Sequence, residues 1–455
     1  MTTPRKTSAP CSSTKPLTLA IASAVLLLAP AAQAQSLVEL YESARTYDAT
    51  YQSAKLQYDA NLARADQAKA GIFPSAALSA GASRVGIDST LPTSNSASTS
   101  FNTQNATLSA TQPLYRPANR ATYEQSFKQV DLARAQLESA SQDLIVRTSQ
   151  AYFDVLAAQD TLTFVRAQKE AVAEQLAFAK RNFEVGTSTI TDTREAQARY
   201  DLVIAQEIAA ENDLRVKKIA LDQLVGITES QPKSLAAPVN LPAVQPADVT
   251  TWVRQSEQLH PAIRQAQSNA DIADLEVTKA EAGHKPTLDA TASYNVTKNP
   301  SNTATLSGIS SRANTSSVGV LFNVPLFAGY SIQNRIRETL SLRDKARSDL
   351  EGARRSVAQN VRTAYFGVQS GQGQVKALEA AELSSQSALD ANKLGYQVGV
   401  RINIDVLNSQ SQLFQTKRDL AQARYNVLLG GLRLRQASGT LTAEDLGQIN
   451  GLLAR

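Results

Sequence analysis

The chain has 455 residues, of which 42% are hydrophobic but only 5% are aromatic, and it contains one Cys, one Met and two His. His260 and His284 are the only histidines, so the sequence offers few residues for a histidine metal site or a Ser-His triad. The sequence also lacks the motifs G-x-x-x-x-G-K-[ST], H-E-x-x-H and G-x-S-x-G. We therefore expect no enzyme, no metal site and no cofactor, and we expect His260-Pro261 to form the first turn of a helix.

The first 34 residues have the form of a secretory signal peptide. Three basic residues, Arg5, Lys6 and Lys15, come before an apolar run from Leu17 to Ala29. A small-x-small cleavage site then ends at Ala34. A membrane anchor or buried helix is the alternative, but the run is shorter than the ~20 residues of a helical span. Cleavage removes the only cysteine and lowers the formal net charge from +5 to +2. We expect an exported chain without disulfides and without nucleic acid as a partner.

The mature chain contains an internal repeat. Residues in the first half recur 212 or 213 positions later: Gly71 as Gly283, Pro74 as Pro286, Ala151-Tyr152-Phe153 as Ala364-Tyr365-Phe366, and Gly226 as Gly439. We predict a first repeat at 35–230, a proline-rich linker at 231–250, a second repeat at 251–440 and a tail at 441–455. The linker and the tail are candidates to wrap the outside of a helical tube.

Each repeat begins with a helix and a β-hairpin and continues into very long helices. Gly and Pro are absent from 118 to 185, which permits one helix of roughly 100 Å. We expect long helices at about 117–185 and 192–225, and again at about 330–398 and 405–438. Three glycines should soften the third of these helices near its middle: Gly367, Gly371 and Gly373. Apolar residues at three/four spacing predict a coiled-coil seam, although an ordinary bundle core explains them equally well.

The two hairpins are expected at about 75–115 and 287–327. Apolar and polar residues alternate without exception from Leu288 to Val296, and about ten such residues allow a tilted strand to cross a bilayer. A second apolar row is Val318, Val320, Phe322, Val324 and Leu326. A half-buried soluble sheet is the alternative. The Ser/Thr/Asn-rich stretches 86–105 and 298–315 are predicted to be exposed loops outside the cell.

No mature segment approaches an apolar run of 18 residues, so a membrane crossing would have to use strands closed into a barrel. Four strands per chain cannot close, because known barrels start at about eight strands. Two chains would supply eight strands and three would supply twelve. Long helices mounted on a barrel that is wide enough to leave a lumen favour three chains and twelve strands.

The turns between the long helices are the candidate functional sites. We expect Gly186 and Gly399 to end one helix in the left-handed conformation, and Asp192 and Asp405 to open the next by accepting from backbone N–H groups. Asp192 with Glu195 also has capping-box spacing. If both turns lie at the free end of a tube, the same residues would attract cations and bond neighbouring helices shut. Capping alone and capping with gating both remain open.

The repeated pattern, together with three segments at 396–407, 423–426 and 437–441, closely resembles the TolC family of Gram-negative outer-membrane channels. The segments read YQVGVRINIDVL, ARYN and ASGTL. The resemblance implies a mixed α+β membrane protein: a homotrimer with a twelve-stranded transmembrane β-barrel in the outer-membrane lipid, continued by a long α-helical periplasmic barrel. It also implies docking to a periplasmic adaptor and to an inner-membrane transporter that supplies the energy.

The resemblance further implies roles for residues of the turns. A network that closes the periplasmic end matches Thr191, Asp192, Tyr396 and Arg401, and an acidic entrance ring matches Asp405 and Asn408. The adaptor is expected to dock at the turns that contain Gly186 and Gly399. Because position 408 is an amide here, a trimer would present three ring carboxylates instead of six, which predicts weaker block by cations. An exported coiled-coil structural protein or adhesin is the alternative, and the cargo and the specific pump stay open.

Overall fold

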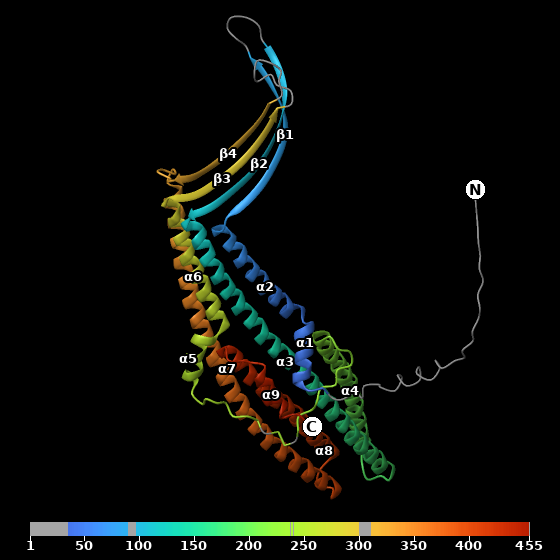
Figure 1. Ribbon diagram of the computed structural model, residues 1–455. Helices are drawn as coiled ribbons and strands as arrows, with labels where there is room; N and C mark the ends of the chain where they lie inside the picture. The colour runs from blue at the N-terminus through green and yellow to red at the C-terminus, as the bar shows by residue number, and fades with distance from the viewer. Residues whose placement is uncertain (1–34, 90–96, 237, 240, 300–310, 455) are drawn as a thin grey trace, which may run out of the picture.

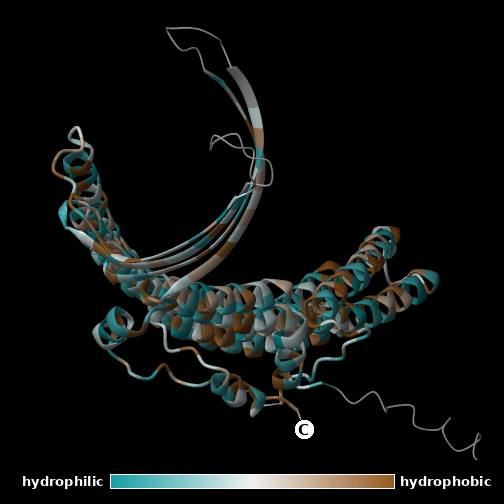
Figure 2. Ribbon diagram, turned by 45° about the horizontal axis from the view of Figure 1, so that its top comes forward, coloured by the Kyte–Doolittle hydropathy of each residue, from teal (hydrophilic) through white to brown (hydrophobic). Residues whose placement is uncertain are grey.

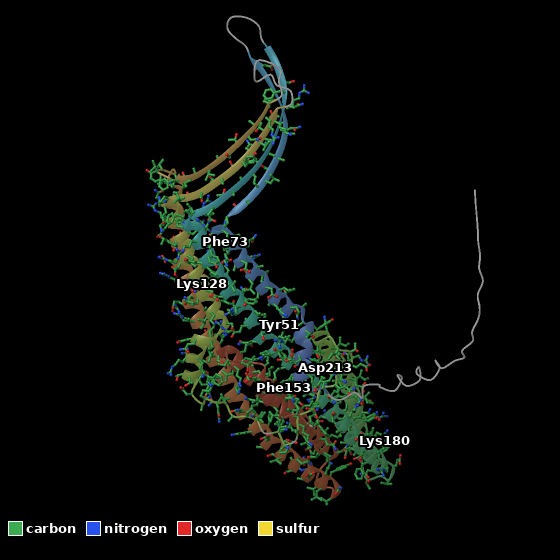
Figure 3. All side chains as sticks on the ribbon, in the orientation of Figure 1. Tyr51, Phe73, Lys128, Phe153, Lys180 and Asp213 are labelled. Atoms are coloured by element: carbon green, nitrogen blue, oxygen red, sulfur yellow. The ribbon has the colours of Figure 1, made fainter. Side chains whose placement is uncertain are left out.

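The computed structural model describes residues 35–89, 97–236, 238–239, 241–299 and 311–454. It consists of one curved β-sheet mounted on a long helical body (Figure 1), and Figure 3 shows the side chains in the same orientation. The predicted signal peptide lies outside the described residues. Within the described residues, no helix combines the length and the apolar character that a membrane-spanning helix requires.

The same succession of elements occurs twice, which confirms the duplication. The first half contains α1 (Leu37–Tyr47), α2 (Ala49–Lys69), β1 (Ser75–Ser89), β2 (Ala97–Tyr115), α3 (Pro117–Glu184) and α4 (Ile190–Val225). The second half contains α5 (Val249–Leu259), α6 (Pro261–Glu281), β3 (Thr287–Asn299), β4 (Ser311–Asn323), α7 (Ser331–Gln397) and α8 (Asn403–Ser438). A short helix, α9 (Glu444–Asn450), follows in the tail, and 3-10 turns precede β1 and β3.

The helix expected before each hairpin is broken into two at equivalent positions. Asp48 Oδ1 accepts from the Tyr51 N–H at 2.7 Å and opens α2. His260 Nδ1 accepts from the Ala262 N–H at 3.1 Å and opens α6. The predicted role of His260 in a helix-opening turn is thus confirmed. The break at Asp48 was not predicted, because a capping aspartate ends a helix without any Gly or Pro.

The two longest helices, α3 and α7, have 68 and 67 residues. The prediction that glycines soften α7 is wrong, since the helix is continuous through all three of them. A Cβ added to Gly371 would lie 3.0 Å from Val427 of α8, and one added to Gly430 of α8 would lie 3.1 Å from Val368 of α7. The glycines at 371 and 430 therefore allow α7 and α8 to approach closely, and this packing compensates for their weak helix propensity.

Around the lower body the helices pack in the order α4, α3, α8, α7, and nearer the sheet in the order α2, α3, α6, α7. The seam residues Leu144, Val155 and Val361 are buried, in agreement with the three/four spacing. The linker and the tail pair with each other through Leu235 and Leu453. Both also pack against the main apolar core of the helical body.

The sheet is antiparallel in the order β1-β2-β3-β4. The register places Leu78 opposite Leu108, Leu108 opposite Tyr294, and Ala292 opposite Val318, so one face carries a continuous apolar band. On the other face polar side chains bond across the strands, for example Ser293 to Ser317 at 2.8 Å. Figure 2 shows the four strands curving together. The alternation read from the sequence is thus confirmed on β3 and β4.

The strands are longer than predicted, and the loop boundaries at 86–105 and 298–315 were wrong. Pairing continues to Ser89 opposite Ala97 in the first hairpin and to Asn299 opposite Ser311 in the second. A β-ladder is made by backbone groups, so polar Ser, Thr and Asn side chains do not interrupt it. Residues 90–96 and 300–310, which remain of the predicted loops, lie outside the described residues.

The last predicted strand is shorter than its apolar row. β4 ends at Asn323, so Val324 and Leu326 lie beyond it. Pro325 has no N–H to donate to a ladder, which is a physical reason for the end of the strand.

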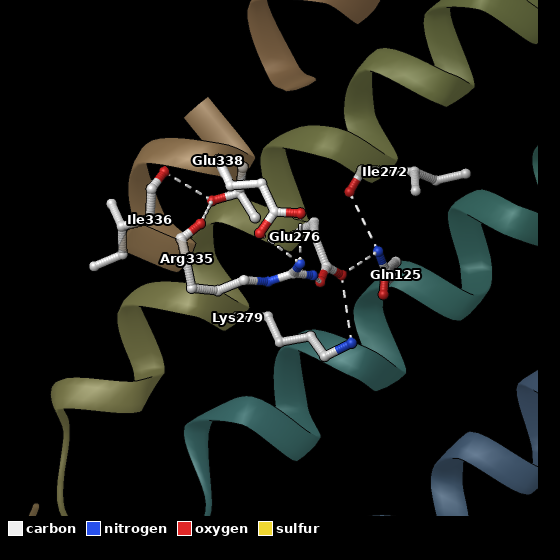
Figure 4. Close-up of polar contacts among 8 residues, drawn as sticks. Gln125, Ile272, Glu276, Lys279, Arg335, Ile336 and Glu338 are labelled. Atoms are coloured by element: carbon white, nitrogen blue, oxygen red, sulfur yellow. Dashed lines mark hydrogen bonds and ion pairs between the residues drawn. The ribbon is translucent and has the colours of Figure 1, made fainter. Parts of the chain in front are cut away.

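Polar contacts attach the sheet to the helices and fix the helices below it. Arg116, at the start of α3, binds both carboxylate oxygens of Asp289 in β3, at 2.8 and 2.6 Å. Just below, Glu276 of α6 accepts from Arg335 of α7 at 2.8 Å and from Gln125 of α3 at 3.1 Å (Figure 4). Beneath the sheet, these hydrogen bonds connect α3 and α7 through α6.

Candidate functional site

Two turns, at 185–189 and 398–402, join the long helices at the end of the body remote from the sheet (Figure 1). Gly186 and Gly399 have φ values of +76° and +77° and adopt the predicted left-handed conformation. A Cβ on either glycine would meet no atom within 4 Å, so both turns face open space. Valines beside them are strongly exposed: Val185 at 73%, Val398 at 65% and Val400 at 78%.

In the first turn the capping residue differs from the prediction. Thr189 is the N-cap: its Oγ1 accepts from the Asp192 N–H at 3.2 Å, and Asp192 Oδ2 accepts from the Thr189 N–H at 3.1 Å. The capping box therefore pairs Thr189 with Asp192, and the predicted Asp192–Glu195 box is wrong. A threonine in extended backbone three residues earlier reaches the free N–H first. Thr191 Oγ1 lies 2.5 Å from Thr189 Oγ1.

Asp192 is held in its charged form. Burial opposes ionisation, but hydrogen bonds from Ser188 and Thr189 outweigh it and hold the pKa of the carboxyl below its ordinary value. The Ser188 hydroxyl donates to it at 2.7 Å. The first turn thus presents a preorganised carboxylate near neutral pH.

The second turn is built differently. α8 begins after Ile402, which makes no side-chain cap, and Asp405 instead lies 3.7 Å from the Arg401 guanidinium. The prediction that Asp405 caps α8 is therefore wrong. Arg401 folds back over α7, where its Cγ occupies the space that a Cβ on Gly395 would need. Because Arg401 is 58% exposed, this ion pair adds little stability.

Tyr396 connects the two helix pairs through its ring. The ring lies edge-on to Phe178 of α3, with centroids 5.6 Å apart. Its hydroxyl is buried and has no hydrogen-bond partner among the described residues. Among those residues, neither Tyr396 nor Arg401 bonds to Thr191 or Asp192. The four predicted network residues therefore lie near the two turns without forming a network within one chain.

A residue that sequence reasoning missed joins the turns directly. Asn403 is fully buried, its Nδ2 donates to the Asp192 carbonyl at 3.2 Å, and its Oδ1 accepts from Gln175 Nε2 at 2.5 Å. It links α8 to both α3 and α4. The repeat offers a signal for it, because the equivalent position of the first half holds the apolar Ile190.

The predicted entrance position 408 also has a basic neighbour. Arg199 of α4 donates from Nη2 to Asn408 Oδ1 at 2.9 Å. With Arg401 beside Asp405, two guanidinium groups lie among the candidate entrance residues. In the described part of the chain, no group of three or more His, Cys, Asp or Glu residues is placed to hold a metal ion.

A four-stranded sheet with one apolar face, carried on long paired helices that end in polar turns, defines the subunit of an outer-membrane channel. The family model for outer membrane efflux proteins matches residues 40–227 and 252–440, once in each repeat. The chain therefore belongs to the outer membrane efflux protein family. It is an outer-membrane exit channel of a Gram-negative bacterium, of the kind that serves efflux and type I secretion.

Similar proteins cover nearly the whole chain. It is 32% identical to outer membrane protein TolC of Vibrio cholerae, over 96% of this chain and 98% of that protein. It is 30% identical to the alkaline protease secretion protein AprF of Pseudomonas aeruginosa, over 93% and 88%. The solved CmeC outer membrane channel of Campylobacter jejuni has the same fold, with a TM-score of 0.77 at 17% identity, covering 92% and 90%. Family and fold are those of channel proteins, which disfavours the adhesin alternative.

Proposed function

We propose that three copies of the chain close a twelve-stranded barrel in the outer membrane and continue it as a helical tunnel. The observation that carries this proposal is the sheet itself. It exposes its apolar band, with Val318 at 89% and Leu78 at 75%, and leaves β1 and β4 as unpaired edges. Unpaired backbone groups cost several kcal/mol each in lipid, so the edges need strands from further copies.

Exposed apolar side chains on the outer helices support the same assembly. Ile208 and Ile219 on α4 are 63% and 58% exposed, and Leu383 and Leu394 on α7 are 73% and 62% exposed. α4 and α7 are the outer helices of the four-helix row, so neighbouring copies would bury these residues. Two copies would supply only eight strands, and a barrel of that size is filled by its own side chains.

The mass of the purified protein in nanodiscs and its conductance in planar bilayers test this proposal. We expect a trimer with stable ion-conducting channels. A monomeric or dimeric mass would overturn the proposed stoichiometry. A trimer without conductance would overturn its role as a conduit.

We further propose that the turns form a gate that is closed at rest. In the trimer, Thr191 and Asp192 would bond Tyr396 and Arg401. These bonds would supply the partner that the buried Tyr396 hydroxyl lacks among the described residues of one chain. Tyr396→Phe and Arg401→Ser should then raise conductance. Tyr47→Phe, an exposed tyrosine far from the turns, is the control. Equal conductance of Tyr396→Phe, Arg401→Ser and the control would contradict the gate.

The channel is proposed to act as a passive conduit, without catalysis. A periplasmic adaptor is expected to contact the turns at Gly186 and Gly399, where exposed valines offer apolar contacts, and an inner-membrane transporter supplies the energy. Photocrosslinkers placed at Val185 and Val400 should capture an adaptor in intact cells. Capture only from a position on the barrel would overturn this docking site.

A further inference from the structure

The linker forms a strap on the surface of the helical body, over α5, α7 and α8. Three side chains of the body donate hydrogen bonds to strap carbonyls: Gln372 to Pro242, Trp252 to Pro246, and Tyr365 to Ala247. Beneath the strap, and bounded also by α9, lies a cavity of about 140 Å³. None of the candidate gate residues lines it.

The wall of this cavity is mainly apolar. Trp252, Val427, Leu428 and Ile449 all lie on it and are at least nine-tenths buried. The charged groups at one end, Arg435 and Asp445, are bound to each other. Two glutamines also lie on the wall: Gln448 accepts from Arg435 at 3.1 Å, and Gln245 is exposed to solvent. The charged groups on the wall are therefore paired and do not favour an ionic ligand.

Glycine in the middle of α8 adds a second argument. Gly430 is explained by its close contact with Val368 of α7, but Gly431 lies on the cavity wall, and an added Cβ would meet no atom within 4 Å. Glycine inside a helix is destabilising relative to alanine. No neighbouring atom requires this glycine, and its lack of a side chain keeps the cavity open.

We propose that this cavity binds one neutral, single-ring aromatic molecule. An apolar cavity of about 150 Å³ binds benzene in another protein. The volume here, about 140 Å³, is close to that value, although this cavity also opens to solvent. The ligand would enter from the strap side, where Pro242 and Ala243 are exposed to solvent. A bound ring would contact Trp252 and hold the strap against α8. The site is independent of the proposed gate.

The chain provides its own reporter for the test, because Trp252 is its only tryptophan. Full-length protein in nanodiscs is titrated with benzene while tryptophan emission is recorded with excitation beyond the absorption of benzene. Wild type should give a saturable change. Gly431→Leu, which fills the cavity, should remove it. Gly447→Leu is the matched control: it also adds a leucine to a helical glycine in open space, on α9 and off the cavity wall.

A linear, non-saturating change in wild type, or the same saturable change in Gly431→Leu, would overturn the proposal. Bilayer conductance of the three proteins should be equal, which separates loss of this site from loss of the channel. If Gly431→Leu does not fold, crystals of wild type under xenon decide the matter. Density in the cavity supports the site, and an empty cavity refutes it.

Discussion

Replacing Asn403 by leucine tests how the two helix pairs of one subunit are held together. The leucine has a similar size, but it removes the hydrogen bonds to Gln175 and to the Asp192 carbonyl. Each such bond contributes about 0.5–1.5 kcal/mol. If both bonds break when the proposed gate opens, Asn403→Leu should destabilise the closed arrangement by about 1–3 kcal/mol. Since 1.4 kcal/mol corresponds to about tenfold, the ratio of open to closed channels should rise by about 5- to 150-fold.

The assay is the open probability of single channels in planar bilayers. Gln175→Leu alone should also open the channel, because it leaves Asn403 fully buried without its partner amide. The double variant should be less open than Asn403→Leu, since replacing both members of a buried polar pair by apolar groups removes the unsatisfied groups. Asn426→Leu is the control, because Asn426 lies on the same helix and its bond to Gln422 is exposed.

Two results would refute this reasoning. The first is an open probability of Asn403→Leu no higher than that of the Asn426→Leu control. The second is strict additivity of the two leucine substitutions, because a shared hydrogen bond requires coupling between them.

Three further predictions follow from other contacts. Arg116→Met leaves the Asp289 side chain, which is only 5% exposed, without its partner. Thermal unfolding should show that the free energy of unfolding falls by about 1–3 kcal/mol. This is less than the usual cost of breaking a buried pair, because Arg116 is 42% exposed. The Arg147 guanidinium holds the pKa of the Asp48 carboxyl below its ordinary value. Ionised Asp48 therefore stabilises the fold above about pH 4, and this contribution is lost as the pH falls further. Asp48→Asn should flatten that part of a series of unfolding measurements from pH 6 to 3. Asn408→Asp should tighten the block of single-channel conductance by multivalent cations, because it adds a carboxylate at the proposed entrance.

Each of these predictions has an outcome that would contradict it. Arg116→Lys keeps the charge and should recover part of the stability, whereas a purely steric role would leave it as unstable as Arg116→Met. An unchanged slope between pH 6 and 3 in Asp48→Asn would contradict the ion-pair argument. Equal cation affinity before and after Asn408→Asp would remove position 408 from the entrance.

The sequence by itself determined the duplicated architecture. A long stretch without Gly or Pro led to a helix within two residues of the observed α3, and the repeat led to one within two residues of α7. The alternation at 288–296 correctly assigned one face of β3. The segments around 396–441 pointed to the family. These features are readable because helix period, strand alternation and helix breakers act over a few residues of one segment.

Capping of the helices at the turns is also a local property, but several nearby residues can act as the N-cap. Thr189 and Asp192 are both good capping types, and only the backbone conformation decided which one is the N-cap. The end of β1 at Ser89 depended on its partner Ala97, since polar residues carry no hydrophobic signal for continued pairing.

Only the tertiary structure revealed contacts between distant parts of the chain. Asn403 meets Gln175 across 228 residues of sequence, and Gly371 meets Val427 of a different helix. The strap above Trp252 closes a cavity that no single segment contains. Such contacts depend on how two elements are placed in space, and residue spacing within either element does not encode that placement. The local pattern therefore determined what each segment is, and packing between segments decided which side chains meet.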